Sequence, residues 1–169
     1  MKMIVPLLLA VIVAAMTACT LSPSEARDGT IASTGVAVEV LYAGTQCGRA
    51  KPDAKVSWVL NAVQLQHVYN KFQKGVPPTV DFDHDRVVLL EMGQRPTLGY
   101  RLVLSESVAR IAQGHVEIVL EWVAPASDMM VGQMLTSPCL LLKLERGSYR
   151  QVWFKNQTGV KKATLVAPQ

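Results

Sequence analysis

Residues able to carry out chemistry are few in this sequence and lie far apart. The three histidines, His67, His84 and His115, share no local spacing, and neither a CxxC nor an HExxH pattern occurs, so no zinc-ligand set is evident. The acidic segment DFDHD, residues 81–85, alternates carboxylates as a calcium loop does, but Arg86 stands where that loop requires glycine. We therefore expect no bound metal and interpret this segment as the polar start of a strand.

The sequence also lacks the short motifs of nucleophilic and nucleotide-dependent enzymes. It contains no GxSxG elbow, no GxxxxGK[ST] loop and no GxGxxG turn. Its serines and histidines are too scattered to nominate a catalytic triad. The net charge of +4 is too small to indicate a nucleic acid partner by itself. We expect a protein that is not an enzyme and that has no cofactor, no nucleic acid partner and no small-molecule substrate.

The first nineteen residues predict export from the cytoplasm. One lysine precedes an uncharged apolar run from Met3 to Ala15, and small residues then lead to Cys19. The run gives about 20 Å of helix, which is short for a hydrocarbon core of about 30 Å, so residues 1–18 are typical of a signal peptide. The end of this segment resembles a bacterial lipoprotein signal, in which the cysteine is lipidated, although leucine is usual at Met16. Cleavage of an ordinary signal peptide near Ala18 is the alternative.

The predicted lipid anchor places the protein in the cell envelope. Lipid chains on Cys19 would attach it firmly, because each buried methylene contributes about 0.8 kcal/mol. Thr20 stands where aspartate would favour the inner membrane in the lipoproteins that the signal resembles, so we expect the outer membrane, facing the periplasm. Residues 19–34 are rich in serine, threonine, glycine and proline and predict a flexible tether. In an oxidising compartment Cys47 and Cys139 are candidates for one disulfide, with two separate buried thiols as the alternative.

The remaining pattern predicts an α+β, mainly β fold: an antiparallel sheet, curled or folded into a sandwich, with one packed helix at about 62–73. Asn61 and Gln64 fit a capping box, and apolar residues at helical spacing form one core-facing stripe: Leu65, Val68, Tyr69 and Phe72. Alternation predicts strands over 35–44, 55–60, 86–92, 100–105, 115–123, 139–145 and 150–156. In the first strand, Val36, Val38, Val40 and Tyr42 are expected to share one face. We expect one domain over 35–160 and a C-terminal tail over 161–169.

Two connections between strands are longer than a turn requires. One is GQRPTLGY, residues 93–100, and the other is residues 125–138, which hold Met129, Met130 and Met134. Long loops in a compact domain tend to be functional or mobile, and flexible methionines suit adaptable binding surfaces. The alternative is that these methionines pack beneath the sheet as core.

Both loops lie within a segment that resembles the C-terminal domain of the PrcB family, named for a subunit of a bacterial cell-surface protease complex. The resemblance is best over 80–146. It rests on Asp81-Phe82 before a strand, Gly93, Pro96-Thr97 with Gly99-Tyr100, and Thr136-Ser137-Pro138 before a hydrophobic strand. Leu98 stands where the family pattern has glycine. Because leucine tolerates positive φ poorly, we expect only Gly99 to adopt it, and we expect the Leu98 side chain to project outward or onto the sheet.

The resemblance implies a binding module that presents its loops to a protein partner, with an envelope protease or its complex as the expected partner. We expect partner contacts from both loops, and Arg95, Thr97 and Leu98 are expected at the tip, without a structural role. The predicted partner-binding residues are Arg95, Pro96, Thr97, Leu98, Gly99, Tyr100, Met129 and Met130. One alternative is a protease inhibitor, since the first loop also resembles that of chagasin-like inhibitors. Another is a structural envelope protein whose basic strip, residues 146–162, contacts the cell wall.

Overall fold

The computed structural model describes residues 35–72 and 74–168, so the predicted signal peptide, Cys19 and the tether lie outside the described residues. Nine strands and one helix follow each other along this part of the chain: β1 (Gly35–Gly44), β2 (Lys55–Val59), α1 (Ala62–Lys71), β3 (Asp85–Glu91), β4 (Arg101–Leu104), β5 (Val108–Ala112), β6 (His115–Val123), β7 (Cys139–Glu145), β8 (Gln151–Asn156) and β9 (Lys161–Val166). The predicted fold class, mainly β with one helix, is confirmed.

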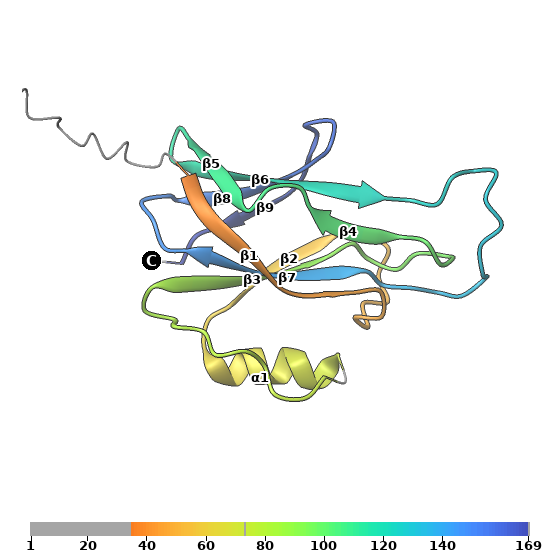
Figure 1. Ribbon diagram of the computed structural model, residues 1–169, viewed down its shortest axis with the longest axis horizontal. Coiled ribbons are helices and arrows are strands. Elements are labelled where there is room, and N and C mark those ends of the chain that lie inside the picture. The colour runs from red at the N-terminus through yellow and green to blue at the C-terminus, as the bar shows by residue number, and fades with distance from the viewer. Residues whose placement is uncertain (1–34, 73, 169) are drawn as a thin grey trace, which may run out of the picture. The chain divides into compact units, whose positions relative to one another are not determined.

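The strands form one curled sheet with the order β2-β3-β7-β1-β5-β6-β8-β9, and β4 pairs with β6 (Figure 1). All pairs are antiparallel except β6 with β8, which run parallel. The curl brings the two ends of the sheet together, since the Trp58 indole N–H of β2 donates to the Val166 carbonyl of β9 over 2.6 Å. The sheet is therefore nearly closed around one apolar interior.

The central strands β3 and β7 are covered on both faces. Val88 and Leu142 point into the interior of the curled sheet, whereas Val87 and Leu141 point toward α1, and all four are fully buried. A strand that is buried on both sides needs apolar residues at every position. This explains the uninterrupted runs VVLL in β3 and CLLL in β7.

The helix begins as the sequence predicts. Asn61 caps it, because its side chain accepts the Gln64 backbone N–H over 2.9 Å, and the Gln64 side chain accepts the Leu60 N–H over 2.8 Å. Its apolar stripe packs against β3 and β7, with Leu65 and Tyr69 buried. Burial of this stripe fixes α1 over the outer face of the sheet (Figure 1).

The Tyr42 side chain in β1 lies on the opposite face of the sheet from the one predicted. A bulge between Val40 and Tyr42 shifts the register of β1 against β7, and the extra residue reverses which side chains face which way. Val36 and Val38 enter the interior as expected, but Tyr42 turns to the helix side and stacks on Phe72 with ring centroids 4.7 Å apart. Val40 is left 40% exposed.

Two strands were not predicted from the sequence. The strand β5 is short and forms a hairpin with β6 through Gln113 and Gly114, both at positive φ. The strand β9 lies in the segment expected as a tail, and it pairs with β8 from Gln151 to Lys155. The sheet therefore extends the folded domain beyond residue 160.

Candidate functional site

The two predicted loops are built from one another. The Arg95 N–H donates to the Thr136 carbonyl over 2.7 Å, and the Thr136 N–H donates back to the Arg95 carbonyl over 2.9 Å. The buried Thr136 hydroxyl donates to the Thr97 carbonyl over 3.0 Å. Farther out, the Leu98 N–H donates to the Gly132 carbonyl over 3.0 Å. Residues 93–100 and 125–138 therefore form one hydrogen-bonded unit, which we call the paired loops.

Two glycines allow the first loop to follow this path. Gly93 has φ +89° and lies so close to the Pro52 carbonyl that a side chain would collide with it. Gly99 has φ +92°, and a Cβ there would come within 3.1 Å of the Pro125 ring in the second loop. Leu98 has no positive φ, as expected, and its side chain lies against Gly132. Gly93 and Gly99 are thus required by backbone geometry and close approach.

The base of the paired loops is fixed by Ser137. Its hydroxyl accepts the Gly48 N–H over 2.7 Å and the Arg49 N–H over 3.3 Å. Its own N–H donates to the Thr45 carbonyl over 2.8 Å, and its carbonyl accepts the Cys47 N–H over 3.0 Å. Ser137 is buried, so the Thr136-Ser137-Pro138 motif has a structural role at the start of β7.

The structure contains the predicted disulfide between Cys47 and Cys139. Both cysteines are buried in the cluster beneath α1. Cys139 directly follows the Thr-Ser-Pro motif at the start of β7. The covalent link therefore holds the base of the paired loops to the segment after β1.

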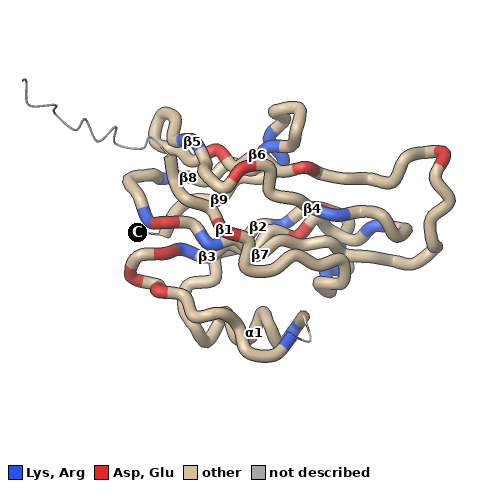
Figure 2. Tube along the Cα trace, viewed as in Figure 1, with Lys and Arg blue, Asp and Glu red and all other residues tan. Residues whose placement is uncertain are grey.

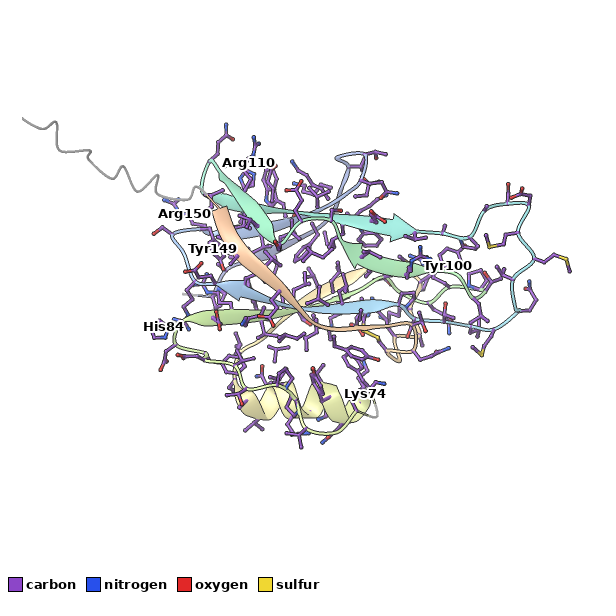
Figure 3. The ribbon with its side chains drawn as sticks, in the orientation of Figure 1. Lys74, His84, Tyr100, Arg110, Tyr149 and Arg150 are labelled. Atoms are coloured by element: carbon purple, nitrogen blue, oxygen red, sulfur yellow. A yellow bond between two sulfur atoms is a disulfide. The ribbon has the colours of Figure 1, made fainter. Side chains whose placement is uncertain are left out.

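The predicted partner-binding residues divide into two groups. Arg95 is half-buried and its guanidinium donates to the Met92 carbonyl over 2.6 Å, while Tyr100 packs against the interior of the sheet (Figure 3). Arg95 therefore has a structural role, as does Thr97 through its carbonyl. This differs from the expectation that both residues lie at the tip without a structural role. The members of the set that are exposed are Pro96, Leu98, Gly99, Met129 and Met130.

The outer part of the paired loops is apolar and nearly uncharged. Met130 is 100% exposed and Met129 59% exposed, and Met134, Leu135 and Leu98 are exposed beside them. The only charged residue from 125 to 138 is Asp128. Figure 2 shows it as the red position on the projecting connection between β6 and β7. The methionines are therefore not core, and this end of the domain presents what we call the methionine tip: Leu98, Met129, Met130, Met134 and Leu135.

A second surface feature, which sequence reasoning missed, lies next to the paired loops. It is a groove of about 400 Å³ between β1 and β4, with Leu140 of β7 also in its lining. No periodicity signals such a groove, since it arises where two strands of the curled sheet fail to pair. It begins at Arg101, the residue after the first loop.

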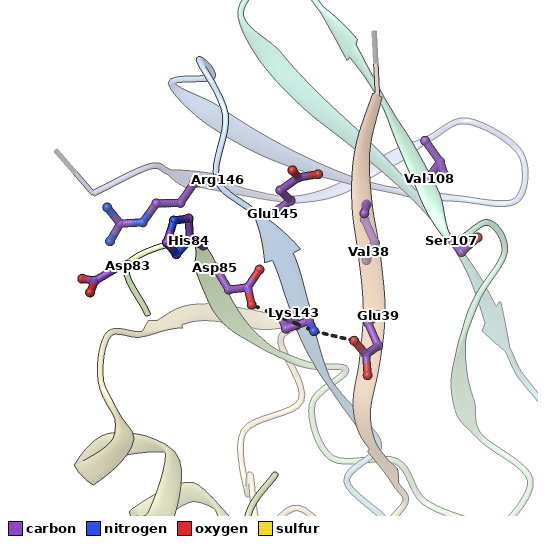
Figure 4. A pocket seen from close by; sticks show the side chains of 11 residues that line it. Val38, Glu39, Asp83, His84, Asp85, Ser107, Val108, Lys143, Glu145 and Arg146 are labelled. Atoms are coloured by element: carbon purple, nitrogen blue, oxygen red, sulfur yellow. Dashed lines mark ion pairs between the residues drawn. The ribbon is translucent and has the colours of Figure 1, made fainter. Parts of the chain in front are cut away.

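A charged pocket of about 640 Å³ lies among the ends of β1, β3 and β7 (Figure 4). Lys143 in its lining pairs with two carboxylates, since its Nζ lies 2.6 Å from Glu39 and 3.9 Å from Asp85. The hydrogen bond that Lys143 donates to the Glu39 carboxylate raises the pKa of Lys143. Among the described residues no group of three or more histidine, cysteine, aspartate or glutamate side chains could hold a metal ion. The two ion pairs of Lys143 thus join β7 to β1 and β3 at this pocket.

The predicted basic strip is partly used within the fold. Lys155 lies 2.7 Å from Glu117, and together with His115 it lowers the pKa of that carboxylate. Lys161 lies over the Trp153 ring, 4.1 Å from its centroid.

No helix in the described part of the chain is long and apolar enough to cross a membrane.

The fold and the paired loops define a small, mainly β domain whose apolar tip is carried on a rigid base. Residues 86–145, from β3 to β7, match the family model described as PrcB C-terminal. The match confirms, over this segment, the resemblance to the PrcB family seen in the sequence. No curated protein and no solved structure matches the chain.

The matched segment contains both paired loops and the strands that hold them. It does not include β1, which lies between β7 and β5 in the sheet. The folded unit is therefore larger than the segment that identifies the family. The family is that of a protease-complex subunit and is not itself a catalytic family.

Proposed function

We propose that this protein is a lipid-anchored envelope protein whose domain is a non-catalytic binding module. In this proposal the methionine tip contacts a protein partner, which the family assignment indicates is a protease or its complex. The observation that carries the proposal is the exposure of Met130 and Met129 on loops that are otherwise tightly hydrogen-bonded. Exposed apolar side chains cost solubility without stabilising the fold, and contiguous ones mark interaction sites.

The rigid base makes this surface suitable for binding. Loops that are ordered before association lose less conformational entropy when they bind. Here backbone pairing at Arg95 and Thr136 and the disulfide at Cys139 order the base. The methionine side chains remain free to adapt to the shape of a partner.

The test compares two double variants in envelopes of the source cells by crosslinking and mass spectrometry. In Met129→Ser with Met130→Ser the tip becomes polar, and capture of the partner should fall by about tenfold or more, since central apolar anchors contribute about 2 kcal/mol or more. The matched control is Val63→Ser with Val76→Ser, which alters two other exposed apolar residues that lie outside the loops. Equal capture by both variants and the wild type would show that the tip is not the interface.

The anchor is proposed from the sequence at Cys19. Cys19→Ser should leave the chain without lipid and move it from the membrane fraction to the soluble fraction. Metabolic labelling with a palmitate analogue provides the direct readout. Labelling that persists in this variant, or its absence in the wild type, would remove lipidation from the proposal.

A further inference from the structure

The strand β4 has one edge that no described strand occupies. It pairs with β6 along Arg101 to Leu104, and its other edge faces β1 across the groove. From Val38 to Gly44, β1 likewise pairs on one side only, with β7. The sheet is thus open along a seam between β4 and the second half of β1.

The hydrogen-bond pattern shows which backbone groups of β4 face this seam. The Trp122 N–H of β6 points away from β4, because it donates to the Gln157 side chain over 3.1 Å. Leu102, which is opposite Trp122, is therefore in a pair without ladder hydrogen bonds. Ser105 does bond to β6, through the Val119 carbonyl over 3.1 Å. Alternation then directs the N–H and C=O groups of Leu102 and Leu104 into the seam.

The facing edge of β1 follows the same logic. The Val38 N–H donates to the Ser107 carbonyl over 2.8 Å, so it points away from β7. Val40, two residues farther along and before the bulge, directs its backbone to the same side. The groove is therefore bordered by backbone donors and acceptors from two strands that diverge.

The lining of the groove is apolar with a single charge. Val40 and Ala43 come from β1, Leu102 from β4 and Leu140 from β7. Arg101 is the one charged residue in the lining, and it forms no ion pair within the described part of the chain. Its position at the first residue of β4 places a cation at the end of the groove nearest the paired loops.

We propose that this groove binds an extended polypeptide segment, which adds as an antiparallel strand to the open edge of β4. Unpaired strand edges are templates for another main chain, and neither lipid nor saccharide offers that regular ladder of donors and acceptors. Antiparallel addition sets the C-terminal end of the segment beside Arg101, which favours a carboxylate there. Apolar side chains of the segment cover Val40 and Val103, the exposed large apolar residues of the lining. This inference rests on the proposed function, since it assigns the segment to the partner that contacts the methionine tip.

The test uses the purified full-length chain and a fluorescent, acetylated short peptide of alternating valine and threonine that ends in glutamate. Ala43→Trp places a bulky side chain in the groove from an exposed position, and it should weaken peptide binding by about tenfold or more, the effect of losing about 1.4 kcal/mol of contacts. Ala37→Trp is the matched control, because it lies on the same strand, is exposed and does not line the groove. Thermal unfolding of both variants checks that the fold persists.

Two further measurements distinguish strand addition from apolar adhesion. Bound peptide should protect the Leu102 and Leu104 amides from hydrogen exchange, and methylation of alternate peptide nitrogens should abolish binding. With both peptides amidated at the C-terminus, Arg101→Glu should weaken binding of the one ending in glutamate but not of one ending in lysine. Absence of peptide binding, binding unaffected by Ala43→Trp, or no protection of these amides would overturn the proposal.

The outcomes separate this inference from the proposed function. One outcome is that the peptide fails to bind while the double variant at Met129 and Met130 still loses capture of its partner. In that case the groove is not a binding site, and the methionine tip remains the proposed interface. If that variant keeps its partner, the proposed function fails whatever the peptide does.

Discussion

The hydroxyl of Thr136 should couple the two loops, and Thr136→Val tests this directly. Valine keeps the shape of the side chain but cannot donate to the Thr97 carbonyl, 3.0 Å away in a half-buried site. Loss of one such hydrogen bond, with its acceptor left unpaired, costs about 1–2 kcal/mol. A folded domain has about 5–15 kcal/mol of stability, so the variant should remain folded and the loops should open about tenfold more often.

Two assays measure these effects. Urea unfolding, followed by tryptophan fluorescence, gives the change in the free energy of unfolding. Hydrogen exchange of the Leu98 amide, which donates to Gly132 across the loops, reports local opening and should become about tenfold faster. Thr136→Ser retains the hydroxyl and is the control. A Thr136→Val protein with wild-type stability and unchanged exchange at Leu98 would refute the coupling of the loops.

Three other predictions concern the scaffold. Replacing Cys47 and Cys139 by alanine should lower the free energy of unfolding by about 4–5 kcal/mol on the chain-entropy account, because the link spans a sequence separation of 92; a loss below about 1 kcal/mol in urea would contradict it. Gly93→Ala should cost about 2–4 kcal/mol through positive φ and collision with backbone, seen as a lower melting temperature. Asp81 raises the pKa of His84, so Asp81→Asn should lower that pKa in an NMR titration. The pairing with Asp81 stabilises the fold fully below the ordinary pKa of histidine, and the effect is lost as pH rises through the raised value.

Local patterns in the sequence predicted most elements because each depends on neighbouring residues. The alternation in HVEIVLEWV gives β6, and the spacing of Leu65 and Tyr69 with the cap at Asn61 gives α1. The same approach failed at Tyr42, because one extra residue in β1 reverses the face and only pairing with β7 reveals it. It also missed β9, because the mixed polar and apolar residues of this segment give no clear strand pattern. Only its pairing with β8 makes it a strand.

The sequence by itself determined that this is a mainly β domain with one helix, that Cys47 and Cys139 suit a disulfide, and that the loops around Leu98 and Met130 differ from simple turns. Each of these follows from composition, periodicity or family pattern. Only the tertiary structure decided that the loops are paired with each other, that Arg95 belongs to their base and that β4 leaves an open edge. These features depend on contacts between segments far apart in the chain, where closure of the sheet, and not local preference, sets which groups meet.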